Sequence, residues 1–403
     1  MTWTLLRLIL AQISVHACMT GMRMATPLLA LREGYSPAAV GFLLALFALT
    51  QVFLSLPAGR YADRHGLKRP LAISVTVASI GAGAAVMFPI YPVLCFAALC
   101  SGGASGSALI ALQRHVGREA KDQVMLRKMF SWLAIGPAAS NFLGPFLAGL
   151  LIDYAGGEAA SDAGFRAAFL LLALLPLSAW LWVLTLQETK PEPKPAGSKK
   201  STAWDMLQSQ GFRRLLLMNW ALSSCWDVHT FVVPILGHER GLSASAIGSI
   251  LGAFAIAAAA VRLLIPFVSE RITEWKVVMT AMIGACMLFC IYPLMPSALA
   301  MMACSVCLGF VLGSVQPMVM SMIHMVTPAH RQGEALGLRM MAINGSSVLM
   351  PMLFGSIGTV VGVGALFWAV GGVVGACSRL PWLLGQQDLP ALKHQAAKAL
   401  QQK

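Results

Sequence analysis

Several ionisable residues lie inside long apolar stretches of the chain, and three of them have side chains suited to proton coupling or ligand recognition. His16 and Arg23 occur between residues 5 and 31, and Asp227 occurs between residues 212 and 236. An ionised side chain at membrane depth costs at least about 2.5–3.5 kcal/mol, so it normally persists only where it is paired, hydrated or used. We expect Asp227 to carry protons or recognise a cation, Arg23 to recognise an anion or control Asp227, and His16 to titrate near neutral pH. A static Arg23–Asp227 ion pair is the alternative.

Polar side chains of the first stretch share one helical face. At 100° per residue they fall within a stripe about 100° wide, which would be kept away from lipid. The stripe consists of Gln12, His16, Met19, Thr20, Arg23 and Pro27. We expect it to line a polar path through the protein and to contact the substrate.

The chain repeats itself at an offset of 207 residues, which aligns Pro27 with Pro234 and Gly34 with Gly241. The same offset carries the stripe onto Asn219, Ser223, Trp226, Asp227, Thr230 and Pro234. Two homologous halves in parallel orientation are implied, and such repeats place a substrate site near the membrane midplane between them.

The composition excludes a soluble protein. Only 11% of the residues are charged while 58% are hydrophobic, and the mean hydropathy is +0.73. A soluble domain needs about 25% charged residues, whereas apolar runs of some 20 residues, each long enough to cross a ~30 Å hydrocarbon core, recur here. The nine cysteines lie in apolar stretches, which fits packing and neither a disulfide framework nor a zinc ribbon. We expect no cofactor and no bound metal.

Breaks at charged residues, Pro and Gly predict an all-α polytopic membrane protein with twelve transmembrane helices in two pseudo-symmetric six-helix bundles. The helices are expected at 5–31, 38–58, 70–90, 92–113, 127–152, 165–187, 212–236, 243–267, 276–295, 297–325, 334–359 and 361–384. The predicted domains are an N-terminal bundle (1–187), a linker (188–211) with solvated composition, a C-terminal bundle (212–385) and a tail (386–403).

Lys and Arg placement predicts the orientation. Of the 29 basic residues, 23 fall on the side of the termini and of the loop after the second helix, and three fall on the other side. Basic loops face the cytoplasm, so we expect cytoplasmic termini and contact with anionic lipids but not nucleic acid. The compact chain with its short loops favours a multi-pass protein of a bacterial inner membrane.

The segment between the second and third predicted helices reads Gly59-Arg-Tyr-Ala-Asp63-Arg64-His-Gly66-Leu-Lys68-Arg69. It resembles the loop signature of the major facilitator superfamily, and a degenerate copy, Pro266-x-x-x-Glu270-Arg271, occurs in the second half. The resemblance covers residues 1 to 385 and implies that this loop latches the two halves on the cytoplasmic side. It also implies that Asp63 lies near the N-terminus of the eleventh helix, whose dipole favours an acid.

The fifth predicted helix carries Ser140-Asn-Phe-Leu-Gly144-Pro145-Phe-Leu-Ala148-Gly149, which partly resembles the family's antiporter signature. Small residues there permit close helix contact, and Pro145 is expected to kink the helix. Many drug/proton antiporters of this layout carry an Arg early in the fourth helix, where this chain has none. The signature favours export, and the missing Arg weakens that case.

Several other residues have both a functional and a structural interpretation. Trp226 could stack on a ligand or simply pack, and the helix-buried amides Asn141 and Gln316 could bind solute or bond neighbouring helices. Arg262 and Arg339 lie near helix ends, from which long side chains can reach the membrane surface.

We expect a monomeric secondary transporter, not an enzyme, that exports a small organic solute by proton antiport. Uptake of an organic anion, with Arg23 as partner and proton symport through Asp227 or His16, is the alternative. Copper transport through Met318 and Met322 is weaker, because Met also packs freely in helices. Gly103-Ala-Ser105-Gly106 matches a short Gly-x-Ser-Gly pattern of intramembrane serine proteases. Four residues in a Gly-rich helix carry little specificity, so a membrane-embedded enzyme is the weakest alternative.

Overall fold

The computed structural model describes residues 3–155, 161–188, 202–242, 244–268, 271–361 and 363–388, and these ranges contain helices and no strands. The α-helices are α1 (Trp3–Arg32), α2 (Pro37–His65), α3 (Lys68–Met87), α4 (Tyr91–Glu119), α5 (Gln123–Leu133), α6 (Ile135–Tyr154), α7 (Asp162–Val183), α8 (Gln210–Glu239), α9 (Ala244–Val268), α10 (Glu274–Ile291), α11 (Ala298–Val326), α12 (Gln332–Val361), α13 (Val363–Cys377) and α14 (Leu380–Leu383). Short 3₁₀ turns precede α8 and separate α10 from α11 and α11 from α12, and a π-helical turn follows α14.

The all-α membrane fold expected from hydropathy is confirmed. Within the described ranges, ten helical segments are long and apolar enough to cross a membrane. The helices α8 and α12 have 30 residues each, which exceeds the ~20 that a span requires. All twelve predicted segments therefore coincide with a helix or with a pair of consecutive helices.

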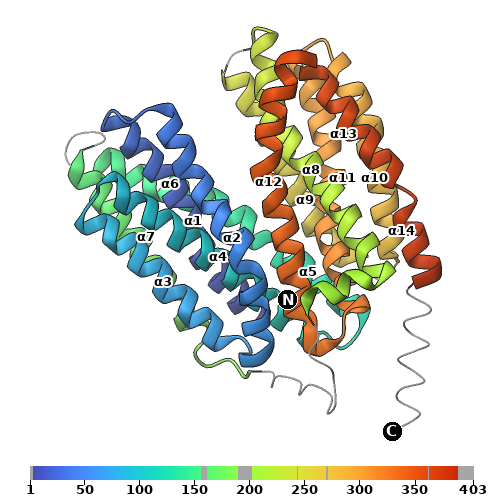
Figure 1. Ribbon diagram of the computed structural model, residues 1–403, viewed down its shortest axis with the longest axis horizontal. Coiled ribbons are helices and arrows are strands. Elements are labelled where there is room, and N and C mark those ends of the chain that lie inside the picture. Colours follow the sequence, from blue (N-terminus) through green and yellow to red (C-terminus); the bar gives the residue numbers. More distant parts are fainter. Residues whose placement is uncertain are drawn as a thin grey trace. The chain divides into compact units, whose positions relative to one another are not determined.

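The chain forms two compact units (Figure 1). The first comprises Met1–Glu119, Trp132–Ala196 and Ala329–Gly345. Its centre is α1, which packs against α4, α6 and α7, while α2 and α3 both pack on α4. The shared core is apolar and includes Met22, Phe47, Phe165 and Phe169. The first turns of α12 also belong to this unit.

The second unit comprises Ala120–Ser131, Gly197–Pro328 and Ser346–Lys403. Here α11 packs against α9, α10 and α8, and α13 packs against α10 and α8. The unit also contains most of α5, so α5 and α12 each contribute residues to both units. The 207-residue offset relates these two helices to each other.

Three differences from the predicted boundaries bear on the residues of the site. The second helix runs to His65 rather than 58, so most of the signature predicted as a loop forms the last turns of α2. The fourth helix runs to Glu119 rather than 113. The fifth breaks between α5 and α6, because Pro137 removes a backbone donor and its ring crowds the carbonyl of Leu133, where α5 ends.

Candidate functional site

Only part of the polar stripe of α1 lies against neighbouring helices of the first unit. Gln12 and Thr20 are buried, His16 is half-buried and Arg23 is exposed. The Nδ1 atom of His16 is 3.0 Å from Oγ of Ser105 on α4, so this hydroxyl orients the imidazole. The stripe therefore combines an oriented imidazole with an exposed guanidinium two turns further along the helix.

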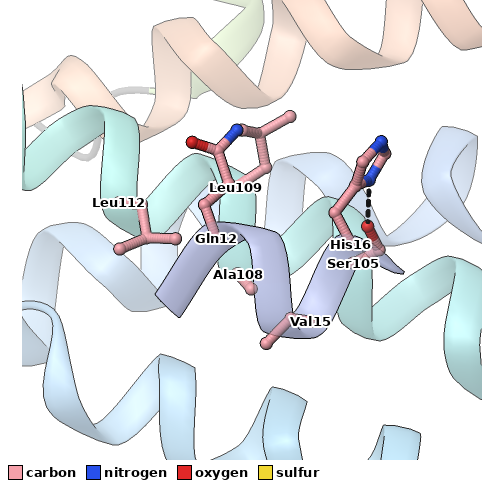
Figure 2. Close-up of a pocket in the computed structure, with 7 residues that line it drawn as sticks. All are labelled: Gln12, Val15, His16, Ser105, Ala108, Leu109 and Leu112. Carbon is pink, nitrogen blue, oxygen red and sulfur yellow. Dashed lines mark hydrogen bonds between the residues drawn. The ribbon is translucent and has the colours of Figure 1, made fainter. Parts of the chain in front are cut away.

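A small cavity of about 10 Å³ is lined by residues of both α1 and α4 (Figure 2). Figure 2 shows the Gln12 amide and the His16 ring on the same side of α1, with Val15 on the opposite side. The volume suits about one water molecule. Among the described residues, Oε1 of Gln12 is buried without a hydrogen-bond partner, so a polar atom near this cavity would satisfy it.

Thr20 and the fifth-helix signature meet where α1 packs on α6. The Thr20 hydroxyl donates to the carbonyl of Ser140 at 2.8 Å. A Cβ atom on Gly144 would lie 2.3 Å from the carbonyl oxygen of Ala17, so only glycine permits this approach. Pro145 is half-buried within α6, and a Cβ on Gly149 would meet only a methionine methyl group at 3.6 Å. Close helix packing thus explains Gly144, and Thr20 contributes to the same contact.

The equivalent stripe of α8 presents Asp227 in the second unit. Both carboxylate oxygens of Asp227 accept from the Ser347 hydroxyl, at 3.2 Å each. Asn219 is buried, whereas Thr230 is exposed and its hydroxyl donates to the carbonyls of Trp226 and Asp227 in its own helix. Asp227 is thus half-buried beside a neutral hydroxyl.

Trp226 packs inside the second unit. Its ring meets Phe254 edge-on, with centroids 4.6 Å apart, and the guanidinium of Arg262 lies 5.7 Å from the ring centroid. The expectation that Arg262 and Arg339 reach the membrane surface is wrong, since they are only 7% and 5% exposed. For Arg262, the indole face gives the cation a favourable partner inside the protein.

The acid of the signature meets the start of α12. In the first unit, the Asp63 carboxylate accepts from the backbone amides of Gly333 at 2.9 Å and Glu334 at 3.0 Å. Nε of Arg114, on α4, donates to the same carboxylate at 2.7 Å, and its Nη2 donates to the Asp63 carbonyl at 3.3 Å. Asp63 and Arg114 are both buried, so the helix dipole and a buried cation together hold this carboxylate.

A second ion pair and two glycines complete this contact. Nε of Arg60 donates to Glu334 at 2.9 Å, and Arg331 donates to the other Glu334 oxygen at 2.6 Å. A Cβ on Gly59 would lie 2.0 Å from the carbonyl oxygen of Gly333, and a Cβ on Gly333 would lie 2.2 Å from the carbonyl oxygen of Gly59. We call Asp63, Arg114, Arg60, Glu334, Gly59 and Gly333 the α12 latch.

The rest of the signature lies outside the α12 latch. Gly66 ends α2 with φ 75°, a conformation that favours glycine. Lys68 donates from Nζ to the Leu184 carbonyl at 2.9 Å, and Glu188 accepts from the backbone amide of Lys68 at 2.8 Å. Arg64 and Arg69 are exposed. In the second copy Arg271 is exposed, and Glu270 lies outside the described residues.

The second unit contains a related contact at the start of α5. Nη1 of Arg127 lies 2.8 Å from Oε1 of Glu274, which also accepts from the Ser321 hydroxyl at 2.9 Å. The 207-residue offset aligns Arg127 with Glu334 and Ser321 with Arg114. Arg127 of α5 and Glu334 of α12 thus occupy equivalent positions. Each forms an ion pair, Arg127 as the cation and Glu334 as the anion.

Sequence reasoning missed the buried cations Arg114 and Arg127. Arg114 directly follows the predicted fourth helix and Arg127 begins the predicted fifth, so both were counted with the basic residues of the loop between these helices. Their carboxylate partners lie 51 and 147 residues away in the chain, and local sequence patterns do not predict such distant ion pairs. One signal was available, since the repeat aligns Arg127 with an acid in the first turn of α12.

The predicted amides lie in unlike surroundings. Asn141 is exposed, which contradicts the expectation of a helix-buried amide, because this part of α6 turns its side chain away from the helices of its unit. Gln316 is half-buried in α11. Met318 and Met322 are completely buried in the packing of α11.

Comparison with known proteins agrees with this geometry. The chain matches the profile of the Major Facilitator Superfamily over residues 8–226 and 215–402. It is 25% identical over 257 residues to Multidrug resistance protein 1 of Bacillus subtilis (strain 168), a match that covers 60% of this chain and 59% of the relative. The chain thus spans somewhat less than two thirds of the length of that relative.

Solved structures share the fold at 14% identity. A bacterial homologue of the iron transporter ferroportin, in an outward-facing state, superposes with a TM-score of 0.77 over 95% of this chain and 100% of its own. The human organic anion transporter MFSD10 superposes with a TM-score of 0.75 over 94% of this chain and 99% of its own. The profile match, which spans nearly the whole chain, shows that this multi-pass membrane protein is a transporter rather than an enzyme and belongs to the Major Facilitator Superfamily.

Proposed function

We propose that the protein is a secondary transporter that exports a small, partly hydrophobic organic solute in exchange for protons. The observation that carries the proton-coupling role is the setting of Asp227, a carboxylate inside the apolar helix α8 beside the neutral Ser347 hydroxyl. A hydroxyl donates to a carboxylate and accepts from a carboxylic acid. Asp227 can therefore gain and lose a proton while keeping the same partner.

The export direction and the solute class rest on two observations. The relative from Bacillus subtilis is named for multidrug resistance. The fifth-helix signature is partly present, and its Gly144 supports the close α1–α6 contact. Both favour outward transport of hydrophobic organic molecules.

The α12 latch supplies the conformational step in this proposal. It joins the end of α2 to the start of a helix whose second half belongs to the other unit. We propose that the Asp63 and Glu334 contacts break and re-form as a monomer alternates access. The predicted domain boundaries, the cytoplasmic termini and the bacterial inner membrane are part of the same proposal.

The test is transport of ethidium by the protein reconstituted in vesicles with an imposed proton gradient. Asp227→Asn is expected to abolish gradient-driven accumulation while exchange of internal for external ethidium continues, because only the proton step is lost. Asp153→Asn is the matched control, since it makes the same chemical change at an exposed carboxylate near the end of α6. Uphill transport by Asp227→Asn at the unaltered rate would remove this residue from proton coupling.

Uptake of an organic anion is the second candidate function. Arg23 favours it, because an exposed guanidinium on the polar stripe of α1 can pair with a carboxylate. The structural likeness to a human organic anion transporter agrees with this possibility through the fold alone. Thermal-shift measurements with cationic dyes and with organic acids distinguish the two functions, since a ligand at a hundredfold excess over Kd stabilises by about 2.7 kcal/mol. Stabilisation by an acid that Arg23→Ala removes would favour uptake.

A further inference from the structure

A groove of about 350 Å³ opens between α2, α3 and α4 in the first unit. Leu54 and Pro57 of α2 form one wall, Ile73 and Val77 of α3 form the other, and Gly103 and Ser107 of α4 lie between them. The volume is within the ~300–1,000 Å³ range of small-molecule sites. None of the residues that line this groove belongs to the α12 latch or to the polar stripes, so the proposed transport path does not use it.

The packing of the three helices explains why the groove exists. Both α2 and α3 pack extensively along α4, whereas they contact each other little. Most of the α4 residues on the floor are small, including Gly103, Ala104 and Ser107, and they leave space between the two walls unfilled. Leu54 and Ile73 on the rim are 44% and 51% exposed, so the opening faces the surroundings of the helix bundle.

The dimensions of the groove suit a chain molecule that lies along the helices. Its α2 wall runs from Leu54 to Tyr61, which is about 10 Å at 1.5 Å per residue. One leaflet of the hydrocarbon core is about 15 Å thick, half of ~30 Å. All three helices are apolar segments long enough to span a membrane. The groove thus extends along about two thirds of one leaflet.

One end of the groove carries basic side chains. Tyr61 and Pro70 line that end, and the turn joining them contains Arg64, Lys68 and Arg69. Arg64 and Arg69 are exposed, and Arg69 directly precedes the groove residue Pro70. The neighbouring acids are already bonded, because Asp63 is buried in the α12 latch and Glu188 accepts from the backbone amides of α3. An anionic group at this end would therefore meet exposed cations.

We propose that the groove binds one acyl chain of an anionic phospholipid, with the lipid head group on Arg69 and Arg64. The apolar walls accommodate the chain in the leaflet that faces the basic turn. Basic side chains near a membrane surface attract anionic lipids. The site is independent of the transported solute, so it extends the proposed function without resting on it.

The test uses vesicles of phosphatidylethanolamine and phosphatidylglycerol that contain phosphatidylglycerol with a photoreactive diazirine in its acyl chain. After illumination, mass spectrometry of the full-length protein locates the labelled residues. We expect labelling concentrated on the groove residues of α2, α3 and α4. We also expect several times less labelling with a phosphatidylcholine probe that carries the same acyl chain.

Three variants sharpen the result. Ser107→Leu fills the groove from its floor and should reduce its labelling several-fold. Ala58→Leu fills it from the α2 wall with the same expected effect, so the prediction can still be tested if one of the two variants fails to fold. Thr76→Leu adds apolar volume on an exposed face of α3 outside the groove and should leave the labelling unchanged. Arg69→Gln should lower labelling by phosphatidylglycerol about fivefold, the equivalent of ~1 kcal/mol, and leave phosphatidylcholine labelling unaltered.

Two results would overturn the proposal. Labelling spread evenly over the exposed apolar faces of other helices, such as the face of α7 with Leu170 and Leu174, would show ordinary lipid contact and no site. Equal labelling by the two head groups would remove the role of the basic turn. Because neither measurement involves transport, both remain informative whatever happens to the proposed export of ethidium.

Discussion

Replacing Asp63 with Asn tests the α12 latch most directly. The substitution preserves the shape of the side chain but removes its charge from a site where Arg114 donates at 2.7 Å. The new amide can still accept one backbone bond from the start of α12, but its NH₂ group faces a second N–H donor. The change therefore leaves the cation of Arg114, whose side chain is only 2% exposed, without its counter-charge.

The magnitude follows from this burial. Removing one partner of a buried ion pair costs about 3–5 kcal/mol, because the remaining charge is neither solvated nor paired. In a unit of roughly 200 residues, each kcal/mol lowers the melting temperature by about 2–4 °C. Asp63→Asn is thus expected to lower the apparent Tm by about 6–20 °C.

The assay is thermal unfolding of the purified protein in detergent, applied as a double-mutant cycle. Arg114→Met should cost less than Asp63→Asn, because the amides and the dipole of α12 still stabilise the carboxylate. The double variant contains neither charge, so it should be more stable than Asp63→Asn alone. Arg166→Gln is the control, since Arg166 is exposed on α7 and its loss should change the Tm little.

One outcome would refute the reasoning about this pair. If the Tm losses of Asp63→Asn and Arg114→Met simply add in the double variant, the two side chains are not energetically coupled. The α12 latch would then depend on the backbone contacts alone. A loss in Arg166→Gln as large as that in Asp63→Asn would show instead that the protein responds to any change of charge.

Three further predictions use single substitutions. Gly59→Ala should impair transport of ethidium by vesicles, because its Cβ would lie 2.0 Å from a backbone oxygen of α12, while Gly41→Ala, with open space around its Cβ, should not. Gly144→Ala should lower the apparent Tm by several degrees because it forces α1 and α6 apart, whereas equal losses in Gly149→Ala would contradict that reason. Ser105→Ala should retain some transport and alter its pH dependence, measured as rate against pH, because the α1 imidazole loses its orienting hydroxyl; complete loss would contradict a positioning role.

The residues of the signature show where sequence reasoning succeeds. The family resemblance pointed to Asp63 and to the start of the eleventh helix, and the structure brings these two together. Both motifs also contain glycines, Gly59 and Gly144, that lie where two helix backbones approach closely. These residues could be identified from the sequence because each motif has a fixed spacing along the chain.

The charged residues that hold the latch show where such reasoning ends. Arg114 reads as a loop residue because a helix end and a solvated loop share the same local composition. Its burial depends on Asp63, which lies on another helix. From the sequence we expect a kink at Pro145, which belongs to the antiporter-like signature. Pro137, which lies at the start of α6, indicates the observed break between α5 and α6.

The sequence by itself determined the membrane class, the number of apolar segments and the internal repeat, because hydrophobic length and periodicity are local properties of the chain. Only the tertiary structure decided that Thr20 serves helix packing, that Asp227 rests beside Ser347, and that α5 and α12 each contribute to both compact units. These contacts join residues that are far apart in the sequence, so they exist only after the helices have packed. An unpaired buried charge is costly, and the packed structure therefore determines which opposite charge each buried ion meets.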